Sequence, residues 1–244
     1  MEVTTTRFKE FKAGLVAGFP IMLGYLSVSF GVGILACKAG MSPFQAALMS
    51  LTNLTSAGEA AGVEIIAASG TLIEMAFTQL VINFRYVLMG ISLTQRADRS
   101  FSFGHRLIAA YGITDEIFAL MVSGNKKAKP FYMYGLIVLP MFGWTVGTLL
   151  GAIAGQILPQ SVTNALGILL YGMFVAILVP PAKADLRIAC AVISAAAFSG
   201  LFRMYFPRVT SGVAVIVAAL GAAMLCAAFF PVTEKTIEEE GGKR

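Results

Sequence analysis

No charged residue occurs between Lys129 and Lys183, and this gap constrains the fold more than any other feature of the chain. From residue 131 to residue 179 the run is almost wholly apolar, interrupted mainly by the Leu-Pro-Gln stretch at 158–160. A helix rises ~1.5 Å per residue, so roughly 50 residues cover ~75 Å, more than two crossings of a ~30 Å hydrocarbon core. A soluble protein of this size could not bury such a run, so the chain belongs in a membrane.

The composition agrees with this placement. Hydrophobic residues make up 57% of the 244 residues and charged residues only 13%, with a mean hydropathy of +0.80, whereas soluble domains carry about 25% charged residues. Apolar blocks of roughly 20 residues recur without strict alternation, which predicts an all-α, polytopic bundle of about seven or eight helical segments. The segments run approximately over Ala13–Ala36, Ser42–Ser69, Gly70–Leu93, Arg106–Ser123, Phe131–Leu158, Ser161–Val179, Ile188–Tyr205 and Val209–Phe230.

We therefore expect one transmembrane domain at residues 13–230, between a short N-terminal segment, 1–12, and a polar C-terminal tail, 231–244. Arg7, Lys9 and Lys12 predict that the N-terminal segment lies in the cytoplasm, because basic residues favour that side. The other basic residues lie in short connections between apolar blocks, so the net charge of +5 indicates cytoplasmic loops rather than binding of nucleic acid.

Capping patterns in the sequence predict several helix starts, and one of them falls inside an apolar segment. Ser42-Pro43-Phe44-Gln45 combines a serine cap, proline in the first turn and glutamine three residues on. A second capping pattern, Ser56-Ala57-Gly58-Glu59, predicts that the helix stops and restarts within the membrane. Thr114-Asp115-Glu116, after Gly112, is a candidate for another restart, and Pro20 with Gly24 allows a kink or a break in the first segment.

The basic connections create a topological conflict. The loops at 94–105 and 124–130 both carry basic residues and both favour the cytoplasm. A spanning segment at Arg106–Ser123 would place them on opposite sides of the membrane. Either that segment is re-entrant or interfacial, or the second segment is re-entrant, or the rule fails at one loop.

A weak internal repeat is the other organisational signal. Phe19–Gly24 resembles Leu139–Gly143, and an apolar helix with one arginine follows each, at a spacing of about 118 residues. Transporters often show such weak symmetry, and chance similarity between apolar helices is the alternative. A ladder of glycines at 143, 147, 151 and 155 predicts close helix packing, within the chain or with a partner.

Ionisable groups inside a membrane are functional candidates, since each costs ~2.5–3.5 kcal/mol on insertion scales. Glu59 is the most interesting, because Thr55, Ser56 and Gly58 precede it and small residues let a backbone approach a ligand. A broken helix with open amides is also how many transporters build a binding site. The alternative is a structural carboxylate that caps the restarted helix.

Asn83 and Arg85 lie within the third segment. A buried guanidinium can bind a carboxylate through two parallel hydrogen bonds, which suits an amino-acid substrate. The alternative for Arg85 is a structural ion pair with Glu74, three turns away on nearly the same face, or with Asp115. Glu74 itself could simply reach the membrane interface.

Asp115 and Glu116 are adjacent, so on a helix they diverge by ~100° and we expect only one to face a small interior site. That carboxylate could carry a proton. The alternative is an acidic pair that stabilises the start of a helix through the helix dipole.

The sequence lacks the motifs of nucleotide-binding proteins, zinc proteases and disulfide-containing or metal-binding proteins. The chain has no phosphate-binding loop, no dinucleotide fingerprint, no HExxH motif and no paired cysteines, and it has one histidine, His105. Cys37, Cys190 and Cys226 lie in apolar surroundings and read as small core residues. We expect no enzymatic activity, no cofactor and no metal.

Four motifs resemble the AzlC family in order, over nearly the whole chain. They are Pro20 with Gly24-Tyr25, the stretch Leu51–Glu59, Asn83-Phe84-Arg85-Tyr86 and Gly112–Glu116. The resemblance implies a large subunit of a bacterial branched-chain amino-acid exporter in the cytoplasmic (inner) membrane. It also implies a partner, the small AzlD-type membrane subunit.

One residue departs from the family pattern, because members commonly have glutamine where Glu59 stands. The resulting hypothesis is a proton-driven exporter in which Arg85 and the amides of the broken helix hold the substrate carboxylate. Glu59 or Asp115 would hold the ammonium group, and Tyr25, Phe30 or Phe84 would contact the apolar side chain. An importer or channel-like permease of the same fold is the first alternative, and a membrane scaffold without transport is the second.

Overall fold

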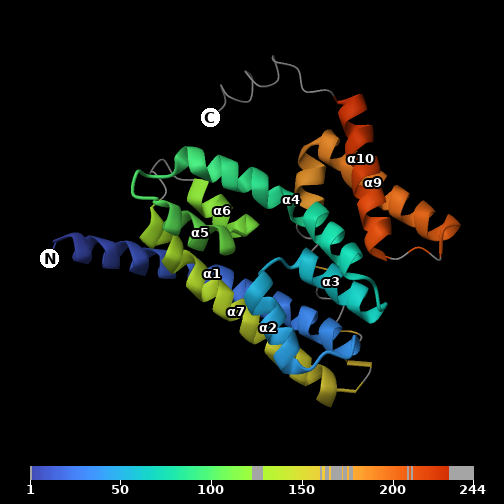
Figure 1. Ribbon diagram of the computed structural model, residues 1–244, viewed down its shortest axis with the longest axis horizontal. Coiled ribbons are helices and arrows are strands. Elements are labelled where there is room, and N and C mark those ends of the chain that lie inside the picture. The colour runs from blue at the N-terminus through green and yellow to red at the C-terminus, as the bar shows by residue number, and fades with distance from the viewer. Residues whose placement is uncertain are drawn as a thin grey trace.

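The computed structural model describes residues 2–122, 129–159, 161, 162, 165, 172, 175, 178–207, 209 and 211–230. These residues form helices and no strand, so the all-α prediction is confirmed. The expected segment Ser161–Val179 lies mostly outside the described residues, as does the polar tail 231–244. The helices are α1 (Glu2–Lys38), α2 (Pro43–Asn53), α3 (Ala57–Ala67), α4 (Leu72–Arg96), α5 (Phe103–Tyr111), α6 (Asp115–Val122), α7 (Pro130–Ile157), α9 (Leu186–Tyr205) and α10 (Ser211–Phe229) (Figure 1).

Four of these helices are long and apolar enough to cross a membrane: Thr6–Lys38 of α1, and the whole of α4, α7 and α9. Helix α1 continues through Pro20 and Gly24, so of the kink and the break that these residues allow, the break does not occur. Proline removes one backbone donor from a helix, and neighbouring helices in a membrane protein can support the altered turn. Pro140 lies inside α7 in the same way.

Helices α1 and α7 lie side by side and run in the same direction, with glycines between them (Figure 1). A methyl group added at Gly14 would meet the Tyr132 carbonyl oxygen, and one added at Gly151 would meet that of Phe30. Gly143, Gly147 and Gly155 also face α1, so the glycine ladder serves a contact within the chain. Lipid gives no hydrophobic force between helices, so this close backbone approach is what stabilises the pair.

The second segment is a helical hairpin. Ser42 caps α2 with the expected capping box, and α2 ends where Leu54 adopts a left-handed conformation, φ 51°. Helix α3 then returns, because Val63 packs in the same cluster as Ala46 of α2 and Ala152 of α7. Both ends of this hairpin therefore lie at the C-terminal end of α1, and its tip, residues 54–56, reaches the level of Trp144, halfway along α7.

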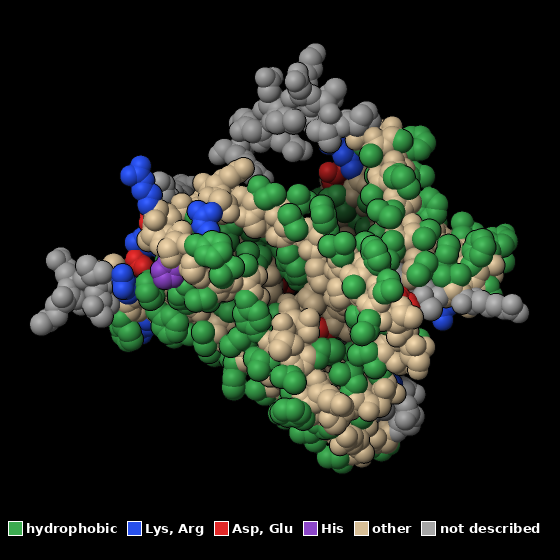
Figure 2. Space-filling view, viewed as in Figure 1, with side chains coloured by type: hydrophobic (Ala, Val, Ile, Leu, Met, Phe, Trp, Pro, Cys, Tyr) green, Lys and Arg blue, Asp and Glu red, His purple; other side chains and the backbone are tan. Residues whose placement is uncertain are grey.

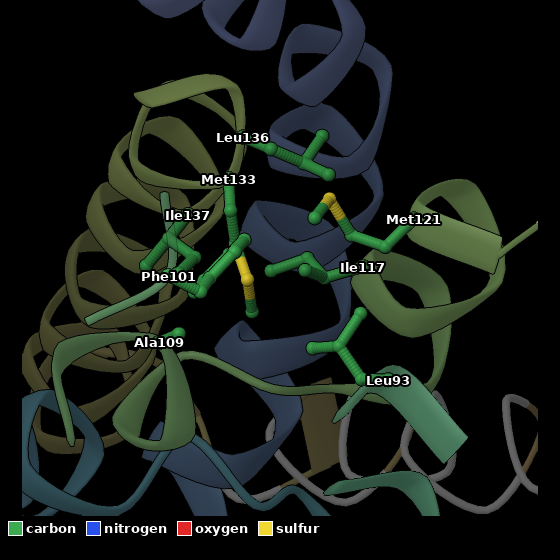
Figure 3. Close-up of a cluster of buried hydrophobic side chains, with 8 residues drawn as sticks. All are labelled: Leu93, Phe101, Ala109, Ile117, Met121, Met133, Leu136 and Ile137. Atoms are coloured by element: carbon green, nitrogen blue, oxygen red, sulfur yellow. The ribbon is translucent and has the colours of Figure 1, made fainter. Parts of the chain in front are cut away.

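The fourth segment is a second hairpin, α5–α6, which enters from the opposite end. His105, at the start of α5, contacts Tyr134 near the start of α7 at 2.5 Å, and Gly112 at the tip lies against Ile137. Val122 at the end of α6 accepts a hydrogen bond from Arg96 at the end of α4. Figure 3 shows the packing that holds this hairpin, a cluster of Leu93, Phe101, Ala109, Ile117, Met121, Met133, Leu136 and Ile137.

This hairpin removes the topological conflict. Both of its ends lie at the N-terminal end of α1, where Lys129 pairs with Glu10 at 2.5 Å and that hydrogen bond raises the pKa of Lys129. Of the three alternatives left open by the sequence, this geometry favours a re-entrant segment at Arg106–Ser123, because Arg96 and Lys129, on either side of the hairpin, lie at one end of the bundle. Figure 2 shows basic side chains and the one histidine gathered at the end where the chain begins.

The two hairpins reveal a shorter repeat than the one expected from the sequence. A long helix followed by a hairpin occurs twice, as α1 with α2–α3 and as α4 with α5–α6, and the second unit runs in the opposite direction. The tip threonines, Thr55 and Thr114, are 59 positions apart. The spacing of about 118 residues is twice this value, and it relates α1 to α7, which run parallel.

The glycine contact predicts a difference between two alanine substitutions. We expect Gly151→Ala to destabilise the protein by about 1–3 kcal/mol, because the methyl group would overlap the Phe30 carbonyl. Gly24→Ala on α1 is the control, since nothing lies within 4 Å of its added methyl group. Thermal unfolding in detergent measures both, and equal stability of the two variants would contradict the packing described here.

The hairpin topology predicts which positions share a side of the membrane. In a chain whose cysteines are replaced by serine, Lys9→Cys and Ser100→Cys should react with an impermeant maleimide from the same side. Ser69→Cys, between α3 and α4, should react only from the other side. Labelling of Lys9→Cys and Ser100→Cys from opposite sides would exclude a re-entrant α5–α6.

Candidate functional site

A cavity of about 190 Å³ lies between the tips of the two hairpins, with long helices around it. At ~30 Å³ per water it has room for about six waters, which suits a small metabolite better than a drug-sized ligand, whose sites take ~300–1,000 Å³. Its lining is Tyr25, Ser56, Ala57, Arg85, Tyr86, Thr114, Asp115, Glu116, Trp144 and Leu178. A larger groove of about 320 Å³ lies between α4 and α5, but its lining is apolar apart from Thr94 and Arg106.

Glu59 does not line this cavity. Its side chain is buried, 2% exposed, and accepts hydrogen bonds from Ser50 Oγ at 2.5 Å, Trp144 Nε1 at 2.9 Å and the Thr55 amide at 3.2 Å. The Thr55 amide belongs to the hairpin tip and would otherwise lack an acceptor in the membrane interior. The geometry therefore favours the alternative interpretation, a carboxylate that satisfies the broken helix.

The capping arrangement differs from the one expected. Ser56 occupies the cap position of α3, but its backbone has φ 38° and its side chain makes no capping hydrogen bond. Glu59 instead reaches back to the Thr55 amide, so the fourth residue of the pattern supplies the contact. The Ser56 side chain is left available at the cavity wall.

A row of polar side chains on α4 holds the same tip from the other side. Gln79 donates to the Gly58 carbonyl at 2.7 Å, and Asn83 donates to Gln79 at 3.0 Å. Thr55 Oγ1 donates to Asn83 Oδ1 at 2.5 Å and receives a longer hydrogen bond, 3.4 Å, from Tyr86. Thr55, Gly58 and Asn83 thus lie together as the sequence suggested, but they bond to one another and do not line the cavity.

Arg85 forms an ion pair with Asp115 across the cavity, from α4 to α6. Both side chains are partly exposed, 39% and 53%, and the guanidinium also lies over the Tyr86 ring at 5.0 Å. Glu74 and Asp115 were the two ion-pair partners considered for Arg85, and in the structure Arg85 pairs with Asp115. Glu74 lies in the first turn of α4 and does not line the cavity.

Glu116 lines the same cavity as Asp115, so the expectation that only one of them could face it is wrong. The N-terminal end of α6 faces the cavity, and side chains that diverge around a helix axis can both reach a space beyond its end. Tyr25 Oη lies 2.5 Å from Glu116 Oε2 and 2.7 Å from Thr114 Oγ1. Tyr25 therefore connects α1 to the tip of the second hairpin.

Gln79, Trp144 and Tyr86 are among the residues of this region that were not predicted as site residues from the sequence. Gln79 stands one turn before Asn83, and that polar pair in an apolar helix was a usable signal. Trp144, the only tryptophan, packs edge-on against Tyr25 at 5.2 Å and bonds Glu59, while Tyr86 follows Arg85 directly. Phe30 and Phe84, expected near an apolar side chain, do not line the cavity.

Comparison with known proteins yields a consistent set of membrane relatives. The family model described as AzlC protein matches residues 20–158. An Archaeoglobus fulgidus protein named as an uncharacterized membrane protein is 32% identical, over 88% of this chain and 93% of its own. The inner membrane protein YgaZ of Escherichia coli is 29% identical, over 79% and 82% of the two chains. The branched-chain amino acid transport protein AzlC of Bacillus subtilis is 23% identical, over 69% and 66%. No solved structure matches the chain.

The contacts of Glu59 predict how two substitutions differ. In Glu59→Gln the amide oxygen can still accept from Trp144 and Thr55, and the amide nitrogen can donate to Ser50, so little stability should be lost. Glu59→Ala leaves the buried Trp144 and Thr55 donors without acceptors, at about 1–3 kcal/mol each. Thermal unfolding of the purified variants measures the difference, and a Gln variant as unstable as the Ala variant would contradict this account.

Proposed function

Because this chain belongs to the AzlC family, we propose that it is a secondary transporter that exports branched-chain or other hydrophobic amino acids, driven by protons. The family and the named transport protein of Bacillus subtilis support membrane transport rather than enzymatic activity. The observation that carries the proposal is the cavity at mid-depth between two hairpins from opposite ends of the bundle. Such a position is where secondary transporters built from inverted repeats bind their substrates.

The cavity offers complementary groups for each part of a zwitterionic amino acid. In the proposed complex the substrate carboxylate lies at the N-terminal end of α3, near the Ala57 amide, with Arg85 beside it. The ammonium group lies at the Glu116 carboxylate, next to the Asp115 carboxylate that pairs with Arg85. The aromatic and apolar wall provides a surface for an apolar side chain, and consists of Tyr25, Tyr86, Trp144 and Leu178.

The remaining candidate residues have a supporting role in this proposal. Glu59, Thr55, Gly58 and Asn83 hold the backbone of the first hairpin tip, so that Ser56 and the start of α3 stay at the cavity wall. The substrate-binding role first suggested for Glu59 therefore passes to residues that line the cavity. A glutamine at this position, as is common in the family, would preserve the anchor.

The distribution of basic residues supports an orientation. Arg7, Lys9 and Lys12 lie in the first turns of α1, and four more basic residues lie in or next to the connections at the same end: Arg96, Arg99, Arg106 and Lys129. Residues 39–84, which include the first hairpin at the opposite end of the bundle, contain no lysine or arginine, and Lys38 directly precedes them. We therefore assign the N-terminal end of α1 to the cytoplasm of a bacterial cell, across the inner membrane.

The family resemblance adds a small AzlD-type membrane subunit to this proposal. Co-expression of the candidate subunit with the tagged chain and purification in mild detergent tests it. A complex of defined stoichiometry supports the partner, whereas full transport by the chain alone in liposomes would exclude an obligatory one.

Arg85 provides the test of the site. We expect Arg85→Gln to lower the efflux of labelled leucine or valine from loaded liposomes at least tenfold, since the cavity loses its cation and Asp115 its partner. Arg203→Gln, an exposed arginine in the last turn of α9, is the matched control and should retain efflux. Efflux by Arg85→Gln at the wild-type rate would contradict the proposed site, and a wild type without efflux would contradict the proposed function.

A further inference from the structure

We propose that Glu116 is the group at which a proton and the substrate ammonium compete, and that Tyr25 passes its charge state to the tip of the second hairpin. The inference rests on the proposed function, because it assumes an amino acid in the cavity. It names the coupling residue, which the sequence left open among several carboxylates.

The hydrogen bonds of the three deep carboxylates separate their roles. Glu59 already accepts from three protein donors and is shielded from the cavity. Asp115 is neutralised by Arg85. Glu116 has only the Tyr25 hydroxyl as a bonded partner among the described residues, so one carboxylate oxygen remains for a ligand or a proton.

The charges around Glu116 favour a cation. The groups that face it are Tyr25 from α1, Arg85 and Tyr86 from α4, its neighbours Thr114 and Asp115, and Trp144 from α7. Since Arg85 and Asp115 cancel each other, an ionised Glu116 leaves one negative charge in a space walled by aromatic rings. A proton or a substrate ammonium can each neutralise it, and the presence of one weakens the binding of the other.

Tyr25 couples this exchange to the hairpin because its hydroxyl has a single proton. When Glu116 is ionised, Tyr25 donates to the carboxylate and Thr114 donates to Tyr25. When Glu116 is protonated, the acid donates to Tyr25, which then donates to Thr114. The direction of the hydrogen bond between Tyr25 and the buried Thr114 thus reverses with the charge of Glu116. When Glu116 is protonated, the Thr114 hydroxyl must donate to another acceptor or lose the hydrogen bond that it donated.

This arrangement predicts antiport of one proton for each amino acid at the site. A substrate that arrives from the cytoplasm displaces the proton from Glu116, and a proton that arrives from outside displaces the substrate. No covalent bond changes, and the only species exchanged at the carboxylate are a proton and an ammonium group.

Proton release upon substrate binding tests the inference directly. The purified full chain, with its small subunit if one co-purifies, is placed in weakly buffered nanodiscs with a pH indicator dye, and leucine is added over a range of pH. The wild type should release protons as leucine binds. Glu116→Gln should release none, and its leucine affinity should no longer depend on pH.

Two other carboxylates serve as comparisons. Glu59→Gln should still release protons, because this side chain is not in the cavity, and so should Glu64→Gln, an exposed glutamate on α3. Proton release that survives in Glu116→Gln, or that is lost only in Glu59→Gln, would overturn the assignment. If Glu116→Gln fails to fold, Tyr25→Phe decides: its proton release should persist with a shifted pH midpoint, and an unchanged midpoint would overturn the role of Tyr25.

The outcomes also separate this inference from the proposed function. If the wild type binds and transports leucine without proton release, the coupling role of Glu116 is wrong and transport stands. If the wild type neither binds nor transports leucine or valine, the proposed function is wrong, and the inference falls with it.

Discussion

Backbone groups at the two helix breaks have no water to bond if the tips lie inside a membrane, and the polar residues of this protein are arranged around that requirement. At the first tip the Thr55 amide bonds Glu59 and the Gly58 carbonyl bonds Gln79. The Leu51 carbonyl, which α2 leaves open near its end, accepts from Tyr111 of the second hairpin. The second hairpin and α4 thus each supply a donor to a backbone carbonyl of the first hairpin.

This requirement divides the polar residues into two groups. Glu59, Gln79 and Asn83 have their bonding capacity taken up by the backbone or by one another. Arg85, Asp115 and Glu116 have capacity left over and face a cavity. A costly ionisable group in a membrane is therefore insufficient evidence for ligand binding, and its remaining hydrogen-bonding capacity is what distinguishes the two groups.

Local patterns allowed much of the fold to be predicted. The capping box at Ser42 is present, and the breaks near Ser56 and Thr114 fall where short polar residues interrupt apolar runs. The direction of each hairpin depends on contacts distant in sequence, such as Tyr111 with Leu51, and no local pattern specifies them. The choice between a binding and a structural role for Glu59 could not be made from the sequence for the same reason, since one of its donors, Trp144, is 85 positions away.

The in-register pairing of α1 with α7 has a consequence for biogenesis. About 90 residues separate the end of α1 from the start of α7, and at ~5–20 residues per second the ribosome needs roughly 5–20 s to make them. During that interval the glycine-lined groove of α1 has only lipid or an insertion factor against it. The nascent chain must therefore keep its first span in the membrane, correctly oriented, before the helix that completes its packing has been translated.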